Sequence, residues 1–522
     1  MWGVFAPVVR RNSMTSAQIY IILAIVIYLV AMIIMGAVYS KKNKSTDDFY
    51  LGGRKLGPLV TAMSAEASDM SSYLLMGLPG LAVVYGIAEA SWTAIGLAVG
   101  TYVNWLIVAK RIRIYSNKIN AVTIPEFFSK RYNDKANVLS LIAALVIIVF
   151  FVPYTSSGFS ACGKLFSSLF GVDYKLAMIV SAVVIVVYTT MGGFTAASVT
   201  DLVQSIVMTV ALFVVVIFGV RQAGGLSAVI ENASTLPDYF SLVSTGDGEG
   251  GVKPYGAITI VSTLAWGLGY FGMPHILLRF MAIEDSKKLK TSRRIASVWV
   301  VISMAVAIFI GTVGVGLIKA GVLSGDFDGE RVIVEISKYL STFGALPAFV
   351  AGIILSGILA ATMSTADSQL LAAASSASQD IFISFFKVKI SQKKAMLIAR
   401  ISVVVITIIG IIIALDENSS IFRVVSFAWA GFGAAFGPLV LFSLFWKRTT
   451  KAGAIAGMVS GGVMVFVWKY LIARLGGIFN IYELLPAFII SSLAIVIFSL
   501  ATEKPSAEVE KAFDEVKEEM AK

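Results

Sequence analysis

Cysteine and histidine are almost absent from this chain of 522 residues, which contains one of each, Cys162 and His275. A single cysteine excludes an intrachain disulfide, and the shortage of both residue types leaves no Cys/His cluster for zinc. We expect Cys162 to be a packing residue. We expect His275 to have a structural role, because no second titratable residue accompanies it in its apolar stretch to form a proton relay.

Charged residues are also scarce, at 14%, whereas 57% of the residues are hydrophobic. This composition excludes a water-soluble globular protein and indicates an all-α polytopic membrane protein. The arm Met1 to Gln18 lacks an apolar run with a small-residue cleavage site, so we expect no removable signal peptide. The net charge of +11 lies in loops between apolar stretches, which is typical of membrane topology rather than of a nucleic-acid partner.

Motifs for several functional classes are missing as well. The sequence has no Walker loop or other nucleotide motif, so ATP is not expected to drive its activity. We find no Ser/His or paired-aspartate motif for an intramembrane hydrolase, and we predict neither an enzyme nor a cofactor. A membrane sensor would need an appended signalling domain, which this sequence does not provide.

The sequence contains thirteen apolar stretches of about 18 residues or more, the length that crosses a bilayer as a helix. They lie near residues 18–39, 59–80, 86–108, 137–158, 173–192, 200–221, 256–277, 295–318, 346–372, 396–414, 422–446, 453–473 and 481–501. We therefore predict thirteen transmembrane helices in a single domain, followed by a charged tail over 502–522 that we expect to be solvated, as a short amphipathic helix at most.

Lysine and arginine are distributed unequally between alternate loops. The basic set comprises Lys41, Lys42, Lys44, Arg54, Lys55, Lys110, Arg111, Arg113, Lys118, Lys130, Arg131, Lys135, Arg279, Lys287, Lys288, Lys290, Arg293, Arg294, Lys387, Lys389, Lys393 and Lys394. The opposite loops are sparse in positive charge, with Lys164 and Lys175 in one of them. The positive-inside rule places the basic set in the cytoplasm, so we predict an outside N-terminus and a cytoplasmic C-terminus in the cell membrane.

Two of the apolar stretches carry glycine and proline at matching places. "MGLPGLAVVYG" (76–86) interrupts the second stretch, and "WGLGYFGMPH" (266–275) interrupts the seventh. Each interrupted stretch opens a block of five. Paired Gly/Pro breaks of this kind indicate an inverted-repeat transporter whose binding site lies at the breaks, although both residues are also common in ordinary transmembrane helices.

The second stretch also carries acidic residues. An acid at the centre of a bilayer costs roughly 2.5 to 3.5 kcal/mol, so Asp69 is a candidate functional residue. Ala67, Met70 and Ser71 fall at 3- and 4-residue spacing, and a helix that unwinds before Gly77 frees carbonyl oxygens for a hard monovalent cation such as sodium.

The ninth stretch offers a second set of oxygen atoms. Ala361, Ser364 and Thr365 share one helix face and provide one carbonyl and two hydroxyl groups. Hydroxyl groups in membrane helices also bond back to their own helix or to neighbouring helices, so each segment alone is weak evidence. Together, the two segments predict a neutral oxygen cage for sodium.

Five segments carry a resemblance to a known family. They are "LGGRKLGP" (51–58), "SAEASDMSSYLLMGLPG" (64–80), "WGLGYFGMPHILLRFM" (266–281), "ILAATMSTADSQLL" (358–371) and "FAWAGFGAAFGPLVLF" (427–442). In this order they resemble the sodium/solute symporter family, and within it the members that carry proline, over about residues 16–500.

The resemblance implies a leucine-transporter-type fold of ten core helices in two inverted repeats, 59–221 and 256–446. One extra helix over 18–39 would precede the repeats and two over 453–501 would follow them.

The resemblance also implies the site residues. The sodium ligands would be Ala67, Met70, Ala361, Ser364 and Thr365; Asp69, Asp201 and Arg54 would take part in sodium coupling; Ser71, Tyr154, Trp266, Tyr270 and Pro274 would bind the substrate. Aromatic faces suit the apolar ring of proline, and the amide-rich end of a broken helix suits its carboxylate. The resemblance therefore implies symport of L-proline with Na⁺ by alternating access.

Some alternatives remain open at this stage. The carried solute could be another small carboxylate such as pantothenate or an osmolyte, and a channel or a sensor is a more distant possibility. Glu66 stands where proline-carrying members have a small residue, and Asp367 where several have an uncharged one. Each of these acids could face a cavity, add to a second cation site or pair with a basic group, so the number of ions is less certain than their identity.

Overall fold

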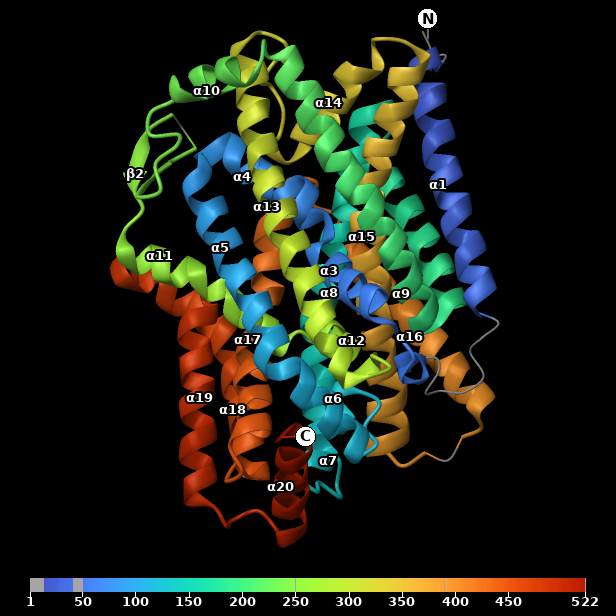
Figure 1. Ribbon diagram of the computed structural model, residues 1–522, viewed down its shortest axis with the longest axis vertical. Coiled ribbons are helices and arrows are strands. Elements are labelled where there is room, and N and C mark those ends of the chain that lie inside the picture. The colour runs from blue at the N-terminus through green and yellow to red at the C-terminus, as the bar shows by residue number, and fades with distance from the viewer. Residues whose placement is uncertain (1–13, 41–49, 249, 389, 522) are drawn as a thin grey trace, which may run out of the picture.

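The computed structural model describes residues 14–40, 50–248, 250–388 and 390–521, which form a bundle of long, roughly parallel helices (Figure 1). The helices of the bundle are α1 (Ser16–Ser40), α3 (Pro58–Ser72), α4 (Leu78–Tyr85), α5 (Ile87–Val103), α8 (Val138–Phe170), α9 (Tyr174–Gln222), α11 (Ala257–Leu264), α12 (Pro274–Ala282), α13 (Leu289–Lys319), α15 (Ala345–Ser375), α16 (Gln392–Ile413), α17 (Ile421–Phe445), α18 (Lys451–Val467) and α19 (Leu484–Ala501).

Nine helices in the described residues are long and apolar enough to cross a membrane, or ten if the bent pair over 257–282 is counted as one span. Two shorter apolar helices cover Tyr174–Val187 and Leu397–Ile413. The chain is therefore an all-α membrane protein, as its composition predicts. The predicted count of thirteen transmembrane helices is consistent with these helices and with the broken second span, and it stays a prediction.

Both segments that carry the paired Gly/Pro motifs are broken. In the first, α3 departs from helical geometry at Ser71, which has φ of 41° and ψ of −171°, and a π-helical turn over Tyr73–Gly77 precedes α4. The break therefore lies ahead of the Gly-Leu-Pro-Gly sequence. Pro79, which has no N–H to donate, lies in the first turn of the new helix, where no donor is needed.

The second broken segment runs from α11 through a 3₁₀ helix, η4 (Ala265–Gly272), to α12. The backbone is extended at Met273, and Pro274 begins α12. The segments Ala257–Gly272 and Pro274–Ala282 are therefore bent by 47° relative to each other. Three glycines in eight residues weaken the α-helix here, and the proline prevents its continuation. The two breaks are in contact with the same central helices, which brings free backbone groups to the middle of the bundle.

Helix α9 covers 49 residues but is kinked, with an apolar helix over Tyr174–Val187 and a span over Gly193–Gln222, in line with the two predicted stretches 173–192 and 200–221. Gly193 interrupts this run with φ of 67°, a conformation that glycine adopts without strain. The residues after it, FTAAS, include no proline, so the chain resumes its helix at once, and Asp201 is buried in the second part of α9.

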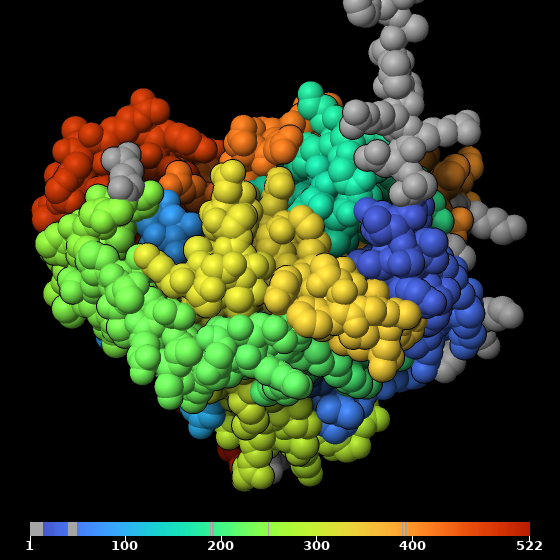
Figure 2. Space-filling view, turned by 90° about the horizontal axis from the view of Figure 1, so that it is seen from above, coloured from blue at the N-terminus to red at the C-terminus, as the bar shows by residue number. Residues whose placement is uncertain are grey.

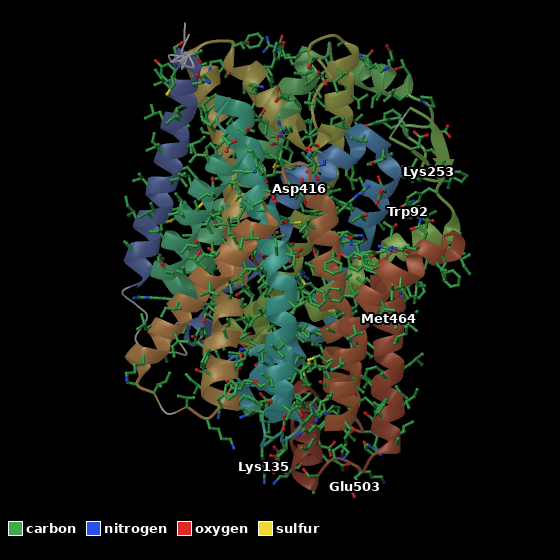
Figure 3. All side chains as sticks on the ribbon, turned by 180° about the vertical axis from the view of Figure 1, so that it is seen from behind. Trp92, Lys135, Lys253, Asp416, Met464 and Glu503 are labelled. Atoms are coloured by element: carbon green, nitrogen blue, oxygen red, sulfur yellow. The ribbon has the colours of Figure 1, made fainter. Side chains whose placement is uncertain are left out.

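The two ends of the bundle carry different short elements (Figure 1). One end holds α10 (Leu226–Ser234), α14 (Val332–Ser341) and the hairpin β1 (Ser244–Gly246) with β2 (Val252–Pro254). Figure 2 looks down on this end, where the green and yellow segments cover the bundle. The other end holds α6 (Ala109–Lys118), α7 (Ile124–Arg131) and α20 (Ala507–Ala521). Figure 3 shows Lys135 and Glu503 at that end and Lys253 toward the opposite one.

The tail, which we expected to be solvated, is instead packed against the basic end of the bundle. Val509, Phe513 and Val516 on one face of α20 are buried, so the amphipathic helix has a folded partner. Its acids bond to the predicted cytoplasmic loops: Glu515 pairs with Lys118 at 2.6 Å, and Asp514 with Lys447 at 2.6 Å.

Lys164 also departs from its prediction as a loop residue. It lies inside α8, buried, with its ammonium group 2.7 Å from both Asp328 and Glu330. Glu330 in turn accepts hydrogen bonds from the first backbone amides of α17, those of Ile421 and Phe422, at 3.2 Å each. Because acids are favourable at helix N-termini, this cluster closes the end shown in Figure 2 by tying the loop before α14 to α8 and α17.

Candidate functional site

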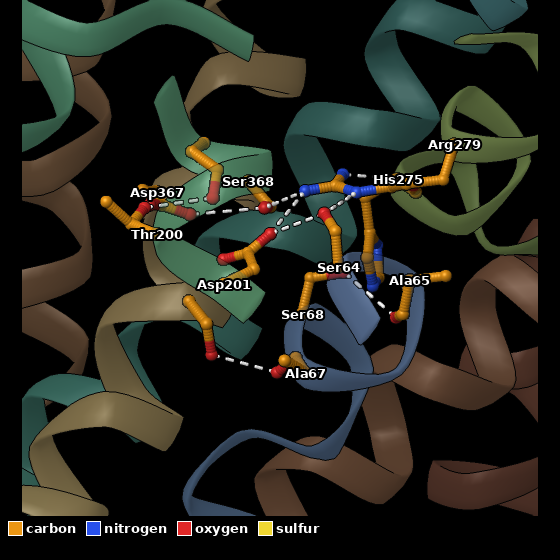
Figure 4. Close-up of polar contacts among 12 residues, drawn as sticks. Ser64, Ala65, Ala67, Ser68, Thr200, Asp201, His275, Arg279, Asp367 and Ser368 are labelled. Atoms are coloured by element: carbon orange, nitrogen blue, oxygen red, sulfur yellow. Dashed lines mark hydrogen bonds and ion pairs between the residues drawn. The ribbon is translucent and has the colours of Figure 1, made fainter. Parts of the chain in front are cut away.

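The predicted sodium-binding segments meet where α3 approaches α15. The Ser364 hydroxyl donates to the Ala67 carbonyl at 2.8 Å, across the two helices. Ser364 at 3.2 Å and Thr365 at 3.1 Å also donate to the Ala361 carbonyl. Figure 4 shows the Ala67 carbonyl at the end of its dashed line, on the blue α3. Four of the five predicted ligands therefore form one buried group of neutral oxygen atoms.

The fifth predicted ligand lies differently. The Met70 carbonyl accepts the backbone N–H of Tyr73, which caps α3 at its break. Thr365 bonds back to its own helix, one of the arrangements that sequence alone left open. The structure thus joins α3 and α15 through Ser364, and the role of each oxygen in binding sodium stays a prediction.

Asp69 lies at the junction of three elements. Tyr270 of η4 donates its hydroxyl to Asp69 Oδ2 at 2.6 Å, and Tyr154 of α8 donates to the Asp69 carbonyl at 3.1 Å. The other carboxylate oxygen, Oδ1, is buried and accepts no hydrogen bond from the described residues. Ser71, in the next turn, accepts the Tyr73 N–H at 3.1 Å and holds the break. Hydrogen bonds therefore connect three predicted site residues, Asp69, Tyr154 and Tyr270, directly beside the break at Ser71.

Trp266 forms the centre of an aromatic wall. Its ring lies 5.7 Å from that of Tyr73, 5.2 Å from Tyr482 and 5.4 Å from Phe422, centroid to centroid. Trp429 donates its indole N–H to the Trp266 carbonyl at 2.7 Å and packs edge-on against Tyr270 at 5.1 Å. Sequence reasoning missed these four partners, although two of them lie in or beside the family segment 427–442 that it quoted.

A small cavity lies between these groups. Its volume is about 10 Å³, near the lower limit for one water molecule. The lining residues are Ser71, Ser72, Tyr154, Thr155, Ser157, Gly158, Thr362, Thr365, Ala366 and Gln369. The cavity touches both the predicted ion ligand Thr365 and the predicted substrate residues Ser71 and Tyr154. At this volume the cavity is too small for an amino acid, so an amino acid could enter it only if the surrounding helices moved apart.

Asp201 belongs to a buried ionic network that meets α3 at Ser64, one turn before Ala67 (Figure 4). Its Oδ2 accepts from Ser64 at 2.6 Å and from Arg279 at 3.1 Å. Arg279 also donates to Ser368 at 2.6 Å, and Ser368 donates to Asp367 at 3.1 Å. Asp367, whose partner the sequence left open, is thus joined to a basic group through one hydroxyl.

The position of Arg279 differs from its prediction as a loop residue. The basic pattern assigned it to a cytoplasmic loop after a span ending at 277, whereas α12 continues to Ala282 and buries the guanidinium group completely. The guanidinium carbon of Arg279 lies over the ring of Phe194, 5.0 Å from its centroid. An arginine is usually counted as a loop residue at a span's end, and only the position of Asp201 on a distant helix reveals that this one is paired.

Two other predicted residues lie apart from the oxygen cluster. Arg54 donates to the carbonyls of Ala121 at 2.6 Å and Met281 at 2.8 Å, at the basic end of the bundle. His275 lies in the first turn of α12, buried, with its ring 5.6 Å from that of Phe151. Pro274, predicted to bind substrate, starts that helix and is buried with it. Cys162 is buried in the core.

Comparison with known proteins adds independent findings. The sodium:solute symporter family matches residues 49–461. The osmoregulated proline transporter OpuE of Bacillus subtilis is 42% identical over 491 residues, covering 94% of this chain and 96% of its own length. The sodium/proline symporter of Haemophilus influenzae is 43% identical over 497 residues, with shares of 94% and 96%.

Two solved structures resemble the bundle as a whole. A Na⁺-coupled sialic acid symporter in a substrate-bound outward-open state has a TM-score of 0.75 at 19% identity, covering 93% of this chain and 99% of its own. MHP1, a nucleobase-cation-symport-1 family transporter in a closed conformation, has a TM-score of 0.56 at 15% identity, with shares of 90% and 99%. Both are cation-coupled transporters, and the expected leucine-transporter-type fold is confirmed.

Proposed function

The chain belongs to the sodium:solute symporter family, and on that premise we propose that it carries L-proline into the cell together with sodium. Two relatives more than 40% identical over nearly the whole chain are named for proline transport. The observation that carries the proposal is the hydrogen bond from Ser364 to the Ala67 carbonyl, because it joins a broken helix to an oxygen-rich helix in the middle of the bundle.

Sodium is proposed to bind between α3 and α15, with the oxygens of Ala67, Ala361, Ser364 and Thr365 as ligands. Oxygen ligands suit a hard cation, and neutral ones leave no uncompensated charge when the ion departs. The Met70 carbonyl accepts the Tyr73 amide and has a second lone pair with which it can join them, so binding of the ion would also act on the break at Ser71.

Proline is proposed to bind beside this site, against Ser71, Tyr154, Trp266, Tyr270 and Pro274. The aromatic wall around Trp266 supplies flat apolar surfaces for the pyrrolidine ring. The N-terminus of α12 carries free backbone amides that suit a carboxylate. The small cavity between Tyr154 and Thr365 would be the remnant of this pocket in the closed form.

The mechanism we propose is alternating access with mutual affinity enhancement. Sodium fixes the unwound part of α3, and this raises the occupancy of the proline pocket, so each ligand strengthens the other by the same factor. The Lys164 cluster is released when the far end opens, and Gly431, Gly433, Gly437 and Pro438 of α17 are the flexing points proposed for inward release.

The topology and repeats are part of the proposal. The basic short elements of the described chain share one end of the bundle, which supports a cytoplasmic location for that end and for α20. Lys41, Lys42, Lys44 and Lys389 fall outside the described residues. The two broken segments support an inverted pair of repeats over 59–221 and 256–446, flanked by 18–39 and 453–501.

Replacing Ser364 by Ala tests the sodium site. We expect the sodium concentration for half-maximal proline uptake in proteoliposomes to rise about tenfold, the equivalent of about 1.4 kcal/mol for one lost ligand. The matched control is Ser356→Ala on the same helix, whose hydroxyl bonds back to Gly352 at 2.8 Å and which should transport normally. Wild-type uptake that ignores sodium would refute the proposed function.

A further inference from the structure

Glu66 lies on the face of α3 opposite to the sodium cluster. It is one turn from Asp69, whereas Ser64 and Ala67 point toward α9, α12 and α15. Its Oε1 atom accepts hydrogen bonds from Thr101 at 3.0 Å and from the indole of Trp105 at 2.8 Å. These two donors hold the carboxyl group inside the bundle, against α5 and the π-helical turn η3 (Asn104–Val108) that follows it.

A closed ring of contacts links Glu66 to Asp69. Asn104 donates its side-chain N–H to the Tyr270 carbonyl at 3.0 Å, and Tyr270 donates its hydroxyl to Asp69 at 2.6 Å. Asn104 lies between Thr101 and Trp105, the two partners of Glu66. Three elements, α3, the α5–η3 junction and η4, are therefore tied together by the hydrogen bonds of Glu66, Asp69 and Asn104.

The backbone makes this close approach possible. Gly100 of α5 lies so close to Gly267 of η4 that a side-chain carbon on Gly100 would overlap the Gly267 backbone, and one on Gly267 would overlap the carbonyl oxygen of Gly96, one turn earlier in α5. The π-helical turn begins at Asn104 itself, and π-helical turns frequently mark functional sites because they redirect one side chain. Here Asn104 is directed to the Tyr270 carbonyl.

Three side-chain oxygen atoms of this ring take part in none of its hydrogen bonds, and all three are acceptors. Glu66 Oε2, Asp69 Oδ1 and Asn104 Oδ1 are buried and receive no hydrogen bond from the described residues. Glu66 is 1% exposed, Asp69 is 5% exposed and Asn104 is 0% exposed. No described basic side chain bonds to either carboxylate. The buried Arg279 donates its hydrogen bonds to Ser64, Asp201 and Ser368 instead.

Two carboxyl groups in such surroundings cannot both carry a charge unless a positive charge lies beside them. Asn104 Oδ1 completes an arrangement that consists of oxygen ligands only, which favours a hard cation. One sodium ion or one proton supplies a positive charge of this kind beside the two carboxyl groups.

We propose that Glu66, Asp69 and Asn104 hold a second coupling cation, a sodium ion or a proton, at a site separate from the sodium site between Ala67 and Ser364. This proposal rests on the proposed cation-coupled symport and deepens it. Asp69 connects the second site to the substrate pocket through Tyr270 and Tyr154, so the second cation acts on the same break in α3. Each turnover then moves one more positive charge than the neutral cage alone would carry.

The test compares the charge moved per proline in proteoliposomes containing wild-type protein or the Glu66→Gln variant. We expect the number of cations per proline to fall by about one in Glu66→Gln and to be retained in Glu66→Asp, since a lost buried charge partner weakens binding far more than a displaced one. The control is Ser68→Ala on α3, whose hydroxyl bonds back to Ala65 at 3.1 Å and which should keep the wild-type ratio.

Two probes identify the cation. Radioactive ²²Na⁺ influx per proline reports sodium, and a pH dye sealed inside the vesicles reports protons that enter with proline. A decrease of either flux in Glu66→Gln supports the site and names its ion. If Glu66→Gln does not fold, Asn104→Leu removes the third oxygen and is expected to raise the half-saturating cation concentration about tenfold, which corresponds to about 1.4 kcal/mol.

An unchanged ratio in Glu66→Gln, with wild-type sodium dependence, would overturn the second site and mean that Glu66 is a structural acid solvated by water. That outcome would leave the proposed function intact, because wild-type uptake would still follow the sodium gradient. Uptake by the wild type that follows neither sodium nor protons would instead overturn the proposed function itself.

Discussion

Replacing Asp69 by Asn is expected to abolish sodium-driven proline uptake, with a loss of about a hundredfold or more in uptake rate at fixed sodium. The Asn side chain can still accept the Tyr270 hydroxyl, which Asp69 holds at 2.6 Å, so the local geometry is kept while the negative charge is lost. Removing one partner of a buried charge pair costs about 3–5 kcal/mol, and each 1.4 kcal/mol is about a tenfold change in affinity.

The measurement is labelled proline uptake at a series of sodium concentrations, with protein amounts matched. Asp173→Asn is the paired control, because Asp173 caps α9 by accepting the Leu176 N–H at 3.0 Å and lies away from the site. A second variant, Tyr270→Phe, removes the hydroxyl alone and should impair uptake less than Asp69→Asn. Normal sodium dependence of Asp69→Asn would contradict the role assigned to this acid.

Replacing Arg279 by Met is expected to destabilise the protein severely, by about 3–5 kcal/mol, because it leaves the Asp201 carboxylate buried without its cation. The guanidinium group is 1% exposed and joins α12 to α3, α9 and α15 through Ser64, Asp201 and Ser368. Neutralising Asp201 as well should restore part of this loss, since a buried amide needs less compensation than a buried charge.

Thermal unfolding in detergent, followed by the loss of monodisperse protein, measures this effect. Arg279→Met, Asp201→Asn and the double variant form a double-mutant cycle, and a coupling energy near zero would show that the two charges do not support each other. Arg221→Met is the control, because Arg221 is exposed at the end of α9 and its loss should be nearly neutral.

The agreement between predicted and observed helices has a simple cause. A helix in lipid must satisfy its own backbone groups and show apolar side chains along its whole length, so its ends are visible as changes in composition. The predicted stretch 422–446 is α17, Ile421–Phe445, and 481–501 is α19, Leu484–Ala501. The Gly/Pro segments break their helices for equally local reasons, since glycine weakens a helix and proline cannot continue one.

The site was predicted less completely. Spacing placed Ala361, Ser364 and Thr365 on one face, and the structure brings that face to Ala67. The Met70 carbonyl accepts the Tyr73 amide at the break, and its role as a ligand stays a prediction, because the exact residue at which α3 breaks decides which carbonyls lose their helical partners. The Gly-Leu-Pro-Gly motif marks the neighbourhood of a break, whereas Ser71 itself carries no sequence signal for φ of 41°.

The charged residues show where sequence reasoning stops. Lys164 and Arg279 look like loop residues at the ends of apolar runs, and both are buried and paired with acids far away in the chain. A hydropathy pattern records the cost of burying a charge but not the position of the partner that offsets it. The same holds for Glu66, whose donors Thr101 and Trp105 are identified only when α5 is packed on α3.

The sequence by itself determined that this chain crosses the membrane many times, which two Gly/Pro segments are broken and which family it belongs to, because each of these depends on local composition or on ordered motifs. Only the tertiary structure decided which buried charges are paired and which acceptor atoms of Glu66, Asp69 and Asn104 are left without a donor. The physical reason is that the energy of a buried polar group depends on its neighbours in space, and distant segments of the chain supply them.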